Sequence, residues 1–340
     1  MTRYISTLAA GIAGGAFFAW LGLPIPWLLG PIIATAALNL SGVRMSCPRG
    51  SRYLGQILIG AVIGLYFTPK MAVLVAGQLP WMVLVAIVTI LLGGFGAWVH
   101  RRLSGLDTAT AFFGSVPGGM AEMMNLGDRF GAEPVALTLS QTIRVTIVVM
   151  LIPAALIYFG EAGSDVFVPL ASAVDWRFLP VLLGGAAIVS VALNRLGVTN
   201  AWMLGACAFT ATLTFYEIEL SAMPQIFSIV AQILIGASLG ERFEREAMAR
   251  APLVIIGSAI TTIVMMGVAA GLALGIAAAS DVSVWAMLAA ASPGGLAEMS
   301  ITAQVLGLGV PLVTAYHVVR VFMITLLTLP MYRIGIRLLN

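Results

Sequence analysis

The chain has 340 residues, of which 60% are hydrophobic and 9% are charged, and its formal net charge is +3. A soluble globular domain carries charges at about a quarter of its positions, so this composition excludes one and predicts an all-α polytopic membrane protein. Most of the arginines fall in short segments between apolar runs, where they set membrane orientation. We therefore expect the lipid bilayer as a partner and no nucleic acid.

Ten apolar runs approach the length of about 20 residues that a membrane-spanning helix needs. The first run follows Arg3 as in a signal peptide, but it shares markers with the second half of the chain and should be retained. The third run of each half is short for a crossing. The runs are 5–22, 26–43, 54–68, 72–98 and 135–159, then 178–194, 201–216, 224–240, 252–276 and 311–332.

The second half of the sequence repeats the first at a spacing of 175 or 176 residues. Markers that recur in one order at one spacing indicate an internal duplication. We predict a first membrane repeat at 1–165, a linker at 166–175 and a second repeat at 176–340. The markers are PGGMAEM at 117–123 and PGGLAEM at 293–299, QILIGA at 56–61 and 232–237, and Arg-Val at 144–145 and 320–321.

Loop charges predict how the repeats lie. Arginine-rich segments at 44–52, 101–102, 242–250 and 333–337 should be cytoplasmic, and the acidic loops near 161–165, 217–219 and 281 should lie outside. These sides agree only if each repeat crosses the membrane an odd number of times. Five crossings plus a re-entrant Pro-Gly-Gly hairpin satisfy this. A discontinuous helix that crosses the membrane also satisfies it, if one of the other apolar runs does not cross. We expect two inverted repeats of about five transmembrane helices each, with both termini cytoplasmic.

Each Pro-Gly-Gly segment should break a helix near the membrane midplane. Proline removes an amide donor, and we expect the glycines to turn the chain at positive φ. Irregular backbone at this depth must be covered by protein or face a wet cavity, and the exposed N–H groups of a helix end attract anions. Close helix packing is the alternative role of the glycines. The predicted binding residues of the breaks are Pro117, Gly118, Gly119, Pro293, Gly294 and Gly295.

Four charged residues accompany the breaks. Glu122 and Glu298 follow each proline by five residues, and Arg144 and Arg320 lie about 15 Å into the membrane. An unpaired charge at this depth is costly. They form either two structural Glu–Arg pairs or, as we favour, a shared site where the arginines bind an anionic substrate or exchange partners as protons move.

Further polar residues lie near the predicted site. Gln141 and His317 precede the two arginines by one helical turn, and Gln56 and Gln232 open the QILIGA segments. They are candidates for a pathway, with helix cross-linking as the alternative, and an imidazole at the midplane could relay protons. The few cysteines and histidines are scattered, so we expect no metal site, no cofactor and no enzymatic activity.

The PGG-x-AEM motifs, the duplicated QILIGA segment and the paired Arg-Val resemble the bacterial AbrB-type membrane family over essentially the whole chain. Its members are labelled as regulators of gene expression or as ammonia monooxygenases. The resemblance implies a duplicated domain in the bacterial inner membrane, with broad similarity to cation/proton antiporters and anion transporters. An ammonia monooxygenase needs a redox metal, and nothing here forms the DNA-binding surface of the soluble regulators with this name.

Three functions are compatible with these features. A secondary transporter of a small, anionic solute, working by alternating access with or without proton coupling, fits inverted repeats with broken helices. A membrane-embedded regulator needs an output domain, but the longest predicted cytoplasmic loops have about ten residues. A channel for a neutral solute such as ammonia needs an uncharged pore. We expect the transporter, either as a monomer or as a homo-oligomer.

Overall fold

The computed structural model describes residues 2–160 and 173–339, and these residues are all-helical, with no strand among them. Of the predicted linker 166–175, only 173–175 belong to the described residues. Glu161 and Asp165 of the predicted outer loop lie outside them. Where the description resumes, the Asp175 N–H donates to Ser221 Oγ at 2.9 Å, which ties this segment to the loop before the helix at 225.

Local sequence explains many helix ends. Proline occupies the first turn of several helices, as at Pro134 and Pro252, where its missing N–H costs nothing. The Asp107 carboxylate caps the helix at 108 by accepting the Thr110 N–H at 2.9 Å. Gly105, with φ 67°, ends the helix at 79–104 in the left-handed conformation that glycine adopts without strain.

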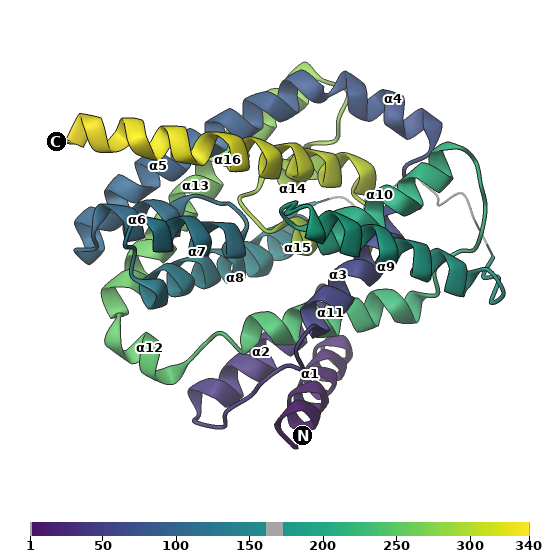
Figure 1. Ribbon diagram of the computed structural model, residues 1–340, viewed down its shortest axis with the longest axis horizontal. Helices are drawn as coiled ribbons and strands as arrows, with labels where there is room; N and C mark the ends of the chain where they lie inside the picture. Colours follow the sequence, from purple (N-terminus) through teal and green to yellow (C-terminus); the bar gives the residue numbers. More distant parts are fainter. Residues whose placement is uncertain (1, 161–172, 340) are drawn as a thin grey trace.

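The helices form two groups, which Figure 1 shows on different sides of the molecule. The six-helix group comprises α1 (Thr2–Trp20), α2 (Pro26–Leu40), α3 (Ser51–Gly64), α9 (Leu179–Arg195), α10 (Ala201–Phe215) and α11 (Gln225–Gly240). The hairpin group comprises α5 (Leu79–Ser104), α6 (Thr108–Ser115), α7 (Met120–Arg129), α8 (Pro134–Phe159), α13 (Pro252–Ala279), α14 (Val284–Ala291), α15 (Leu296–Leu306) and α16 (Val310–Leu339). The short helices α4 (Pro69–Gly77) and α12 (Arg245–Arg250) connect them.

Four helices, α5, α8, α13 and the first 25 residues of α16, are long and apolar enough to cross a membrane. The pair α3 and α4, which is bent by 97°, makes a fifth if it counts as one span. The chain is therefore a multi-pass membrane protein. Each of the ten predicted runs contains a helix, but the run 72–98 is wrong as a single element, because α4 ends at Gly77 and α5 begins at Leu79.

The helices of the two halves contact one another reciprocally. α3 packs on α10 as α11 packs on α2, and α5 packs on α16 as α13 packs on α8. Glycines of the duplicated QILIGA segments make the first pair of contacts close. A Cβ on Gly60 would overlap the Met203 carbonyl oxygen of α10, and a Cβ on Gly236 would lie 2.6 Å from the Leu28 carbonyl oxygen of α2. The segment therefore recurs because each copy crosses a helix of the other half at short range.

The two groups meet where α3 contacts the hairpin group through α15 and α16. In Figure 1, α15 lies near the centre of the molecule, between α3 and the α14–α16 region. All residues of α15 from Leu296 to Ala303 are buried, whereas only Met123 and Gly127 are buried in α7. The second Pro-Gly-Gly segment is thus enclosed at the junction of the groups, and the first lies closer to the surface.

Candidate functional site

Both Pro-Gly-Gly segments are the tips of helical hairpins. After α7 the chain returns to the start of α6, where the Glu133 N–H donates to Thr110 Oγ1 at 2.7 Å. After α15 it returns to α14, where a Cβ on Gly309 would lie 3.9 Å from Ala286 Cβ. Each segment therefore joins two short helices whose outer ends lie close together. The eight residues of α6 span about 12 Å at the rise of an α-helix.

The expectation of positive φ at the tips is wrong. Gly119 has φ −64° and Gly295 has φ −78°, and Gly118 and Gly294 are not among the residues with positive φ. The first glycine of each motif is needed for space. A Cβ on Gly118 would lie 2.7 Å from Met123 Cε. A Cβ on Gly294 would lie 2.7 Å from Met299 Cγ, and Met299 is the equivalent of Met123 in the second motif. The methionine that closes each motif therefore packs beneath its own hairpin tip.

Two buried arginines donate hydrogen bonds to carbonyl groups that have no helical partner because of the breaks. Arg144 Nη1 donates to the Val116 carbonyl at 2.9 Å, and Arg320 Nη1 donates to the Ser292 carbonyl at 2.5 Å. Val116 and Ser292 occupy the same place, directly before the two prolines. Arg320 also donates to the Gly294 carbonyl. Cations at these positions offset the partial negative charge at the carboxyl ends of α6 and α14.

The two structural Glu–Arg pairs, which were the alternative to a shared site, do not form among the described residues. Neither Arg144 nor Arg320 makes an ion pair with a described carboxylate. Glu298, which is 2% exposed, pairs instead with Arg52 of α3, with 3.4 Å between Nη2 and Oε1. Glu122 is half-buried and accepts a hydrogen bond from Thr325 Oγ1 at 3.0 Å. The two glutamates of the repeated motif therefore have different partners.

A cavity of about 60 Å³ lies between the two groups, and both hairpin tips line it. Its volume in this conformation accommodates a few water-sized groups. The N-termini of α7 and α15, at Gly119 and Gly295, carry no side-chain cap. Charged residues of the lining are Arg52, Arg144, Arg242, Glu298 and Arg320, and polar ones include Gln56, Gln141 and Asn200.

Three of these lining residues were missed by the sequence analysis. Arg52 and Arg242 fall in segments that the loop charges assigned to the cytoplasm, yet both side chains reach the cavity. Arg52 precedes Gln56 by four residues and so shares its helix face, a signal that could have identified it. Asn200 carries φ 55° at the start of α10, and its side chain lies beside Gly119 of the first tip.

The other predicted residues take separate positions. Gln141 Nε2 donates to the carbonyls of Phe113 and Val116, so it supports the first break. Gln232 lies 3.4 Å from Ser228 Oγ in α11, outside the cavity lining. His317 is fully buried and also lies outside the lining. Within the described residues, no cluster of three or more Asp, Glu, Cys or His could hold a metal ion.

A second, larger cavity of about 450 Å³ opens next to the first. Its wall includes Met45 and Ser46, the start of α8 and residues from Glu241 to Ala247. Arg242 lines both cavities, and its guanidinium contacts the Met120 sulfur of the first tip. The contact between Met120 and Arg242 therefore lies at the boundary between the inner cavity and this outer vestibule.

Comparison with known proteins finds relatives along most of the chain. Residues 27–335 match the family described as "Transition state regulatory protein AbrB". The chain is 26% identical to the "Uncharacterized protein YhjN" of Bacillus subtilis (strain 168), over 96% of this chain and 91% of that protein. It is also 26% identical to the "Putative regulator AbrB" of Escherichia coli (strain K12), over 89% of this chain and 88% of that protein. The chain thus belongs to the AbrB family of membrane proteins.

Proposed function

We propose that this protein is a secondary transporter of a small anionic solute, which it binds between the two hairpin tips and carries by alternating access. One observation carries the proposal. Four arginines and a single glutamate line one small cavity at the junction of two helix groups, and two uncapped helix N-termini line the same cavity. Both arrangements attract negative charge.

The charges of the lining favour an anion over a cation or a neutral solute. Glu298 pairs with Arg52, so Arg144, Arg242 and Arg320 have no carboxylate partner among the described residues. Buried cations without a counter-charge are costly, and a bound anion offsets that cost. The Nε groups of Arg144 and Arg320 are buried without an acceptor in the described chain, which leaves donors for a ligand.

Contacts at the helix ends support an inverted arrangement of the two halves. At one end of the molecule, Ser104 Oγ donates to the Leu253 carbonyl at 2.7 Å, which joins the end of α5 to the start of α13. The first hairpin follows α5 at this end. The second follows α13 at its other end, where a Cβ on Gly160 would lie 3.4 Å from Trp285. Hairpins that enter from opposite ends fit inverted repeats of five crossings each.

The position of the cavity supports alternating access. Residues of the six-helix group form one wall and the hairpin tips form the other, so a relative movement of the groups would expose the site to either end. The vestibule lies at the end of the arginine-rich segments, where the Cys47 N–H donates to Glu241 Oε2 at 2.5 Å. We assign this end to the cytoplasm by the charge rule, and movement of Met120 away from Arg242 would open the site toward it.

The family name supports a second candidate, a membrane-embedded regulator. In the described part of the chain, every helix except the short connectors α4 and α12 belongs to one of the two membrane groups, so no separate output domain is present there. A regulatory role would then require a partner that reads the conformation of the groups. This hypothesis shares the anion site with the transporter and differs in whether solute crosses the membrane.

Transport assays separate these candidates. The purified chain in proteoliposomes should take up at least one member of a panel of small carboxylates, phosphate and sulfate, and uptake should saturate. Repeating the panel with and without an imposed proton gradient identifies coupling. A protein that binds an anion from the panel but moves none of them would favour the regulator.

A further inference from the structure

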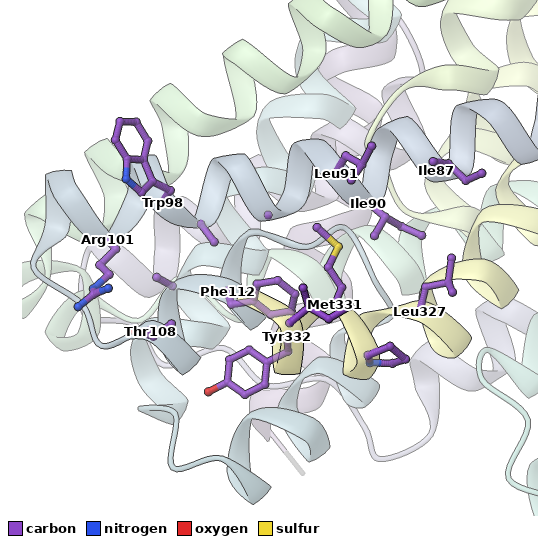
Figure 2. A pocket seen from close by; sticks show the side chains of 15 residues that line it. Ile87, Ile90, Leu91, Trp98, Arg101, Thr108, Phe112, Leu327, Met331 and Tyr332 are labelled. Atoms are coloured by element: carbon purple, nitrogen blue, oxygen red, sulfur yellow. The ribbon is translucent and has the colours of Figure 1, made fainter. Parts of the chain in front are cut away.

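An apolar groove of about 540 Å³ runs along the hairpin group between α5, α6 and α16, away from the proposed solute site. Figure 2 shows Ile87 and Leu327 at one end of it, and Trp98, Arg101 and Thr108 at the other. Gly94 and Ala97 of α5 are the small residues of its lining. A Cβ on Gly94 would lie 2.5 Å from Met331 Cε on the opposite wall.

The charged end of the groove distinguishes it from an ordinary lipid-facing surface. Arg101 lines the groove, is exposed and makes no ion pair with a described residue. Its neighbour Arg102 lies over the ring of Trp98, 5.3 Å from the centroid. The nearby acid Asp107 caps α6 through Thr110 and so has its own partners. This end therefore offers a cation and an interfacial tryptophan, the residues that meet lipid headgroups.

The dimensions fit one lipid chain. From Ile87 to Arg101 the groove follows 14 residues of α5, about 21 Å at the rise of an α-helix. One leaflet contributes about half of a hydrocarbon core 30 Å thick, and the headgroup layer adds to it. A lipid with its phosphate at Arg101 would thus place an acyl chain along the whole groove.

The corresponding surface of the second half lacks these cations. At the spacing of 176 residues, Trp98, Arg101 and Arg102 correspond to Leu274, Ala277 and Ala278. In inverted halves the matching end of the second half lies on the other side of the membrane, where the charge rule expects no arginines, so only the groove at the arginine-rich end offers cations to a lipid.

We propose that this groove is a binding site for one anionic phospholipid, whose phosphate contacts Arg101 and Arg102 and whose acyl chain lies between α5 and α16. The site belongs to the end of the molecule that carries the arginine-rich segments. It is independent of the solute site, so it stands or falls separately from the transport proposal.

Native mass spectrometry of the full chain, delipidated in detergent and titrated with phosphatidylglycerol or phosphatidylcholine, tests this. We expect one phosphatidylglycerol to be retained preferentially. The double variant R101Q/R102Q should bind it about thirtyfold more weakly, because each surface arginine contributes about fivefold. The matched control R44Q/R49Q removes two exposed arginines elsewhere and should bind as the wild type does.

The variant Leu91→Trp supplies a second arm, since it fills the groove at an exposed position and leaves the charges unchanged. It should reduce phosphatidylglycerol retention while the thermal unfolding temperature stays near that of the wild type. Equal retention of both lipids by the wild type, or unchanged retention by R101Q/R102Q, would overturn the proposal. Lipid-free dimers that Leu91→Trp separates would assign the groove to a second copy of the chain instead.

Discussion

The two hairpin tips have the same motif and the same fold but different surroundings. At the second tip, Glu298 is buried and paired with Arg52 of the other helix group. At the first tip, Glu122 is half-buried and bonds the hydroxyl groups of Thr325 in the hairpin group and of Thr199, which precedes α10 of the six-helix group. Two features are shared and build the hairpin. The first glycine of the motif packs against the motif's methionine, and a buried arginine donates to the carbonyl of the residue before the proline. The difference lies in how each tip contacts the six-helix group: the second tip through the buried ion pair of Glu298 and Arg52, and the first through the uncharged side chains of Thr199 and Asn200.

The arginines should differ most in their contribution to stability. Arg320→Met leaves the Ser292 and Gly294 carbonyls without their donor, at about 1–3 kcal/mol each. Arg144→Met costs less, because Gln141 still donates to the Val116 carbonyl at 3.1 Å. Chemical denaturation in detergent should place Arg320→Met at least about 2 kcal/mol below Arg144→Met. Equal losses would mean that Gln141 does not support the first break.

The glycines test how tightly each tip is enclosed. Gly294→Ala meets the Cγ of Met299 at 2.7 Å and Val148 at 3.0 Å, so it should cost about 1–3 kcal/mol. Gly118→Ala meets the mobile Cε end of Met123, which can move aside, and should cost about 1 kcal/mol or less. Shortening the methionine in the double variant G294A/M299A should recover part of the loss. If the double variant loses the sum of the two single losses, the clash is not the cause.

The glutamates test the functional difference between the tips. Glu298→Gln removes the one negative charge of the lining, so an anion should bind about tenfold more tightly and leave more slowly. In a transport assay, KM and turnover should both fall. The matched change Glu122→Gln keeps an acceptor for Thr325 and should alter both by less than about threefold. Equal effects of the two changes would remove the distinction between the tips.

The smallest expected effect concerns Asn200, which lies beside the first tip at φ 55°. Asn200→Gly keeps this backbone conformation accessible, whereas Asn200→Ala strains it by about 1 kcal/mol. The alanine variant should therefore unfold at lower denaturant concentration than the glycine variant. Equal stability of the two variants, or the opposite order, would show that the left-handed backbone at this position does not limit stability.

The sequence predicted the elements that repeat. The PGG-x-AEM motifs are hairpin tips, and Arg144 and Arg320 line one cavity with them, because breaks and charges at membrane depth are costly and so easily recognised. The predicted reason for the glycines was wrong. A backbone with positive φ and a position without space for a Cβ atom both favour glycine, so the sequence does not distinguish these two reasons. Only the structure shows that Met123 and Met299 fill the space beneath the tips.

Partners that come from another helix group could not be read from the sequence. Arg52 and Arg242 look like orientation signals, because a cation near a loop is normally one. Only the packing of α3 against α15 brings Arg52 to Glu298. The break between α4 and α5 at Gln78 was hidden for a similar reason, since the apolar run continues through it.

The central claim is that an anion crosses the membrane through the site between the hairpin tips, and counterflow measures this most directly. Proteoliposomes preloaded with an unlabelled anion that the chain transports should accumulate the labelled anion transiently, as alternating access requires. Glu298→Gln should slow this exchange, while Glu122→Gln should leave it within about threefold of the wild type. No counterflow for any carboxylate, phosphate or sulfate, in wild-type protein that is folded and inserted, would contradict the account.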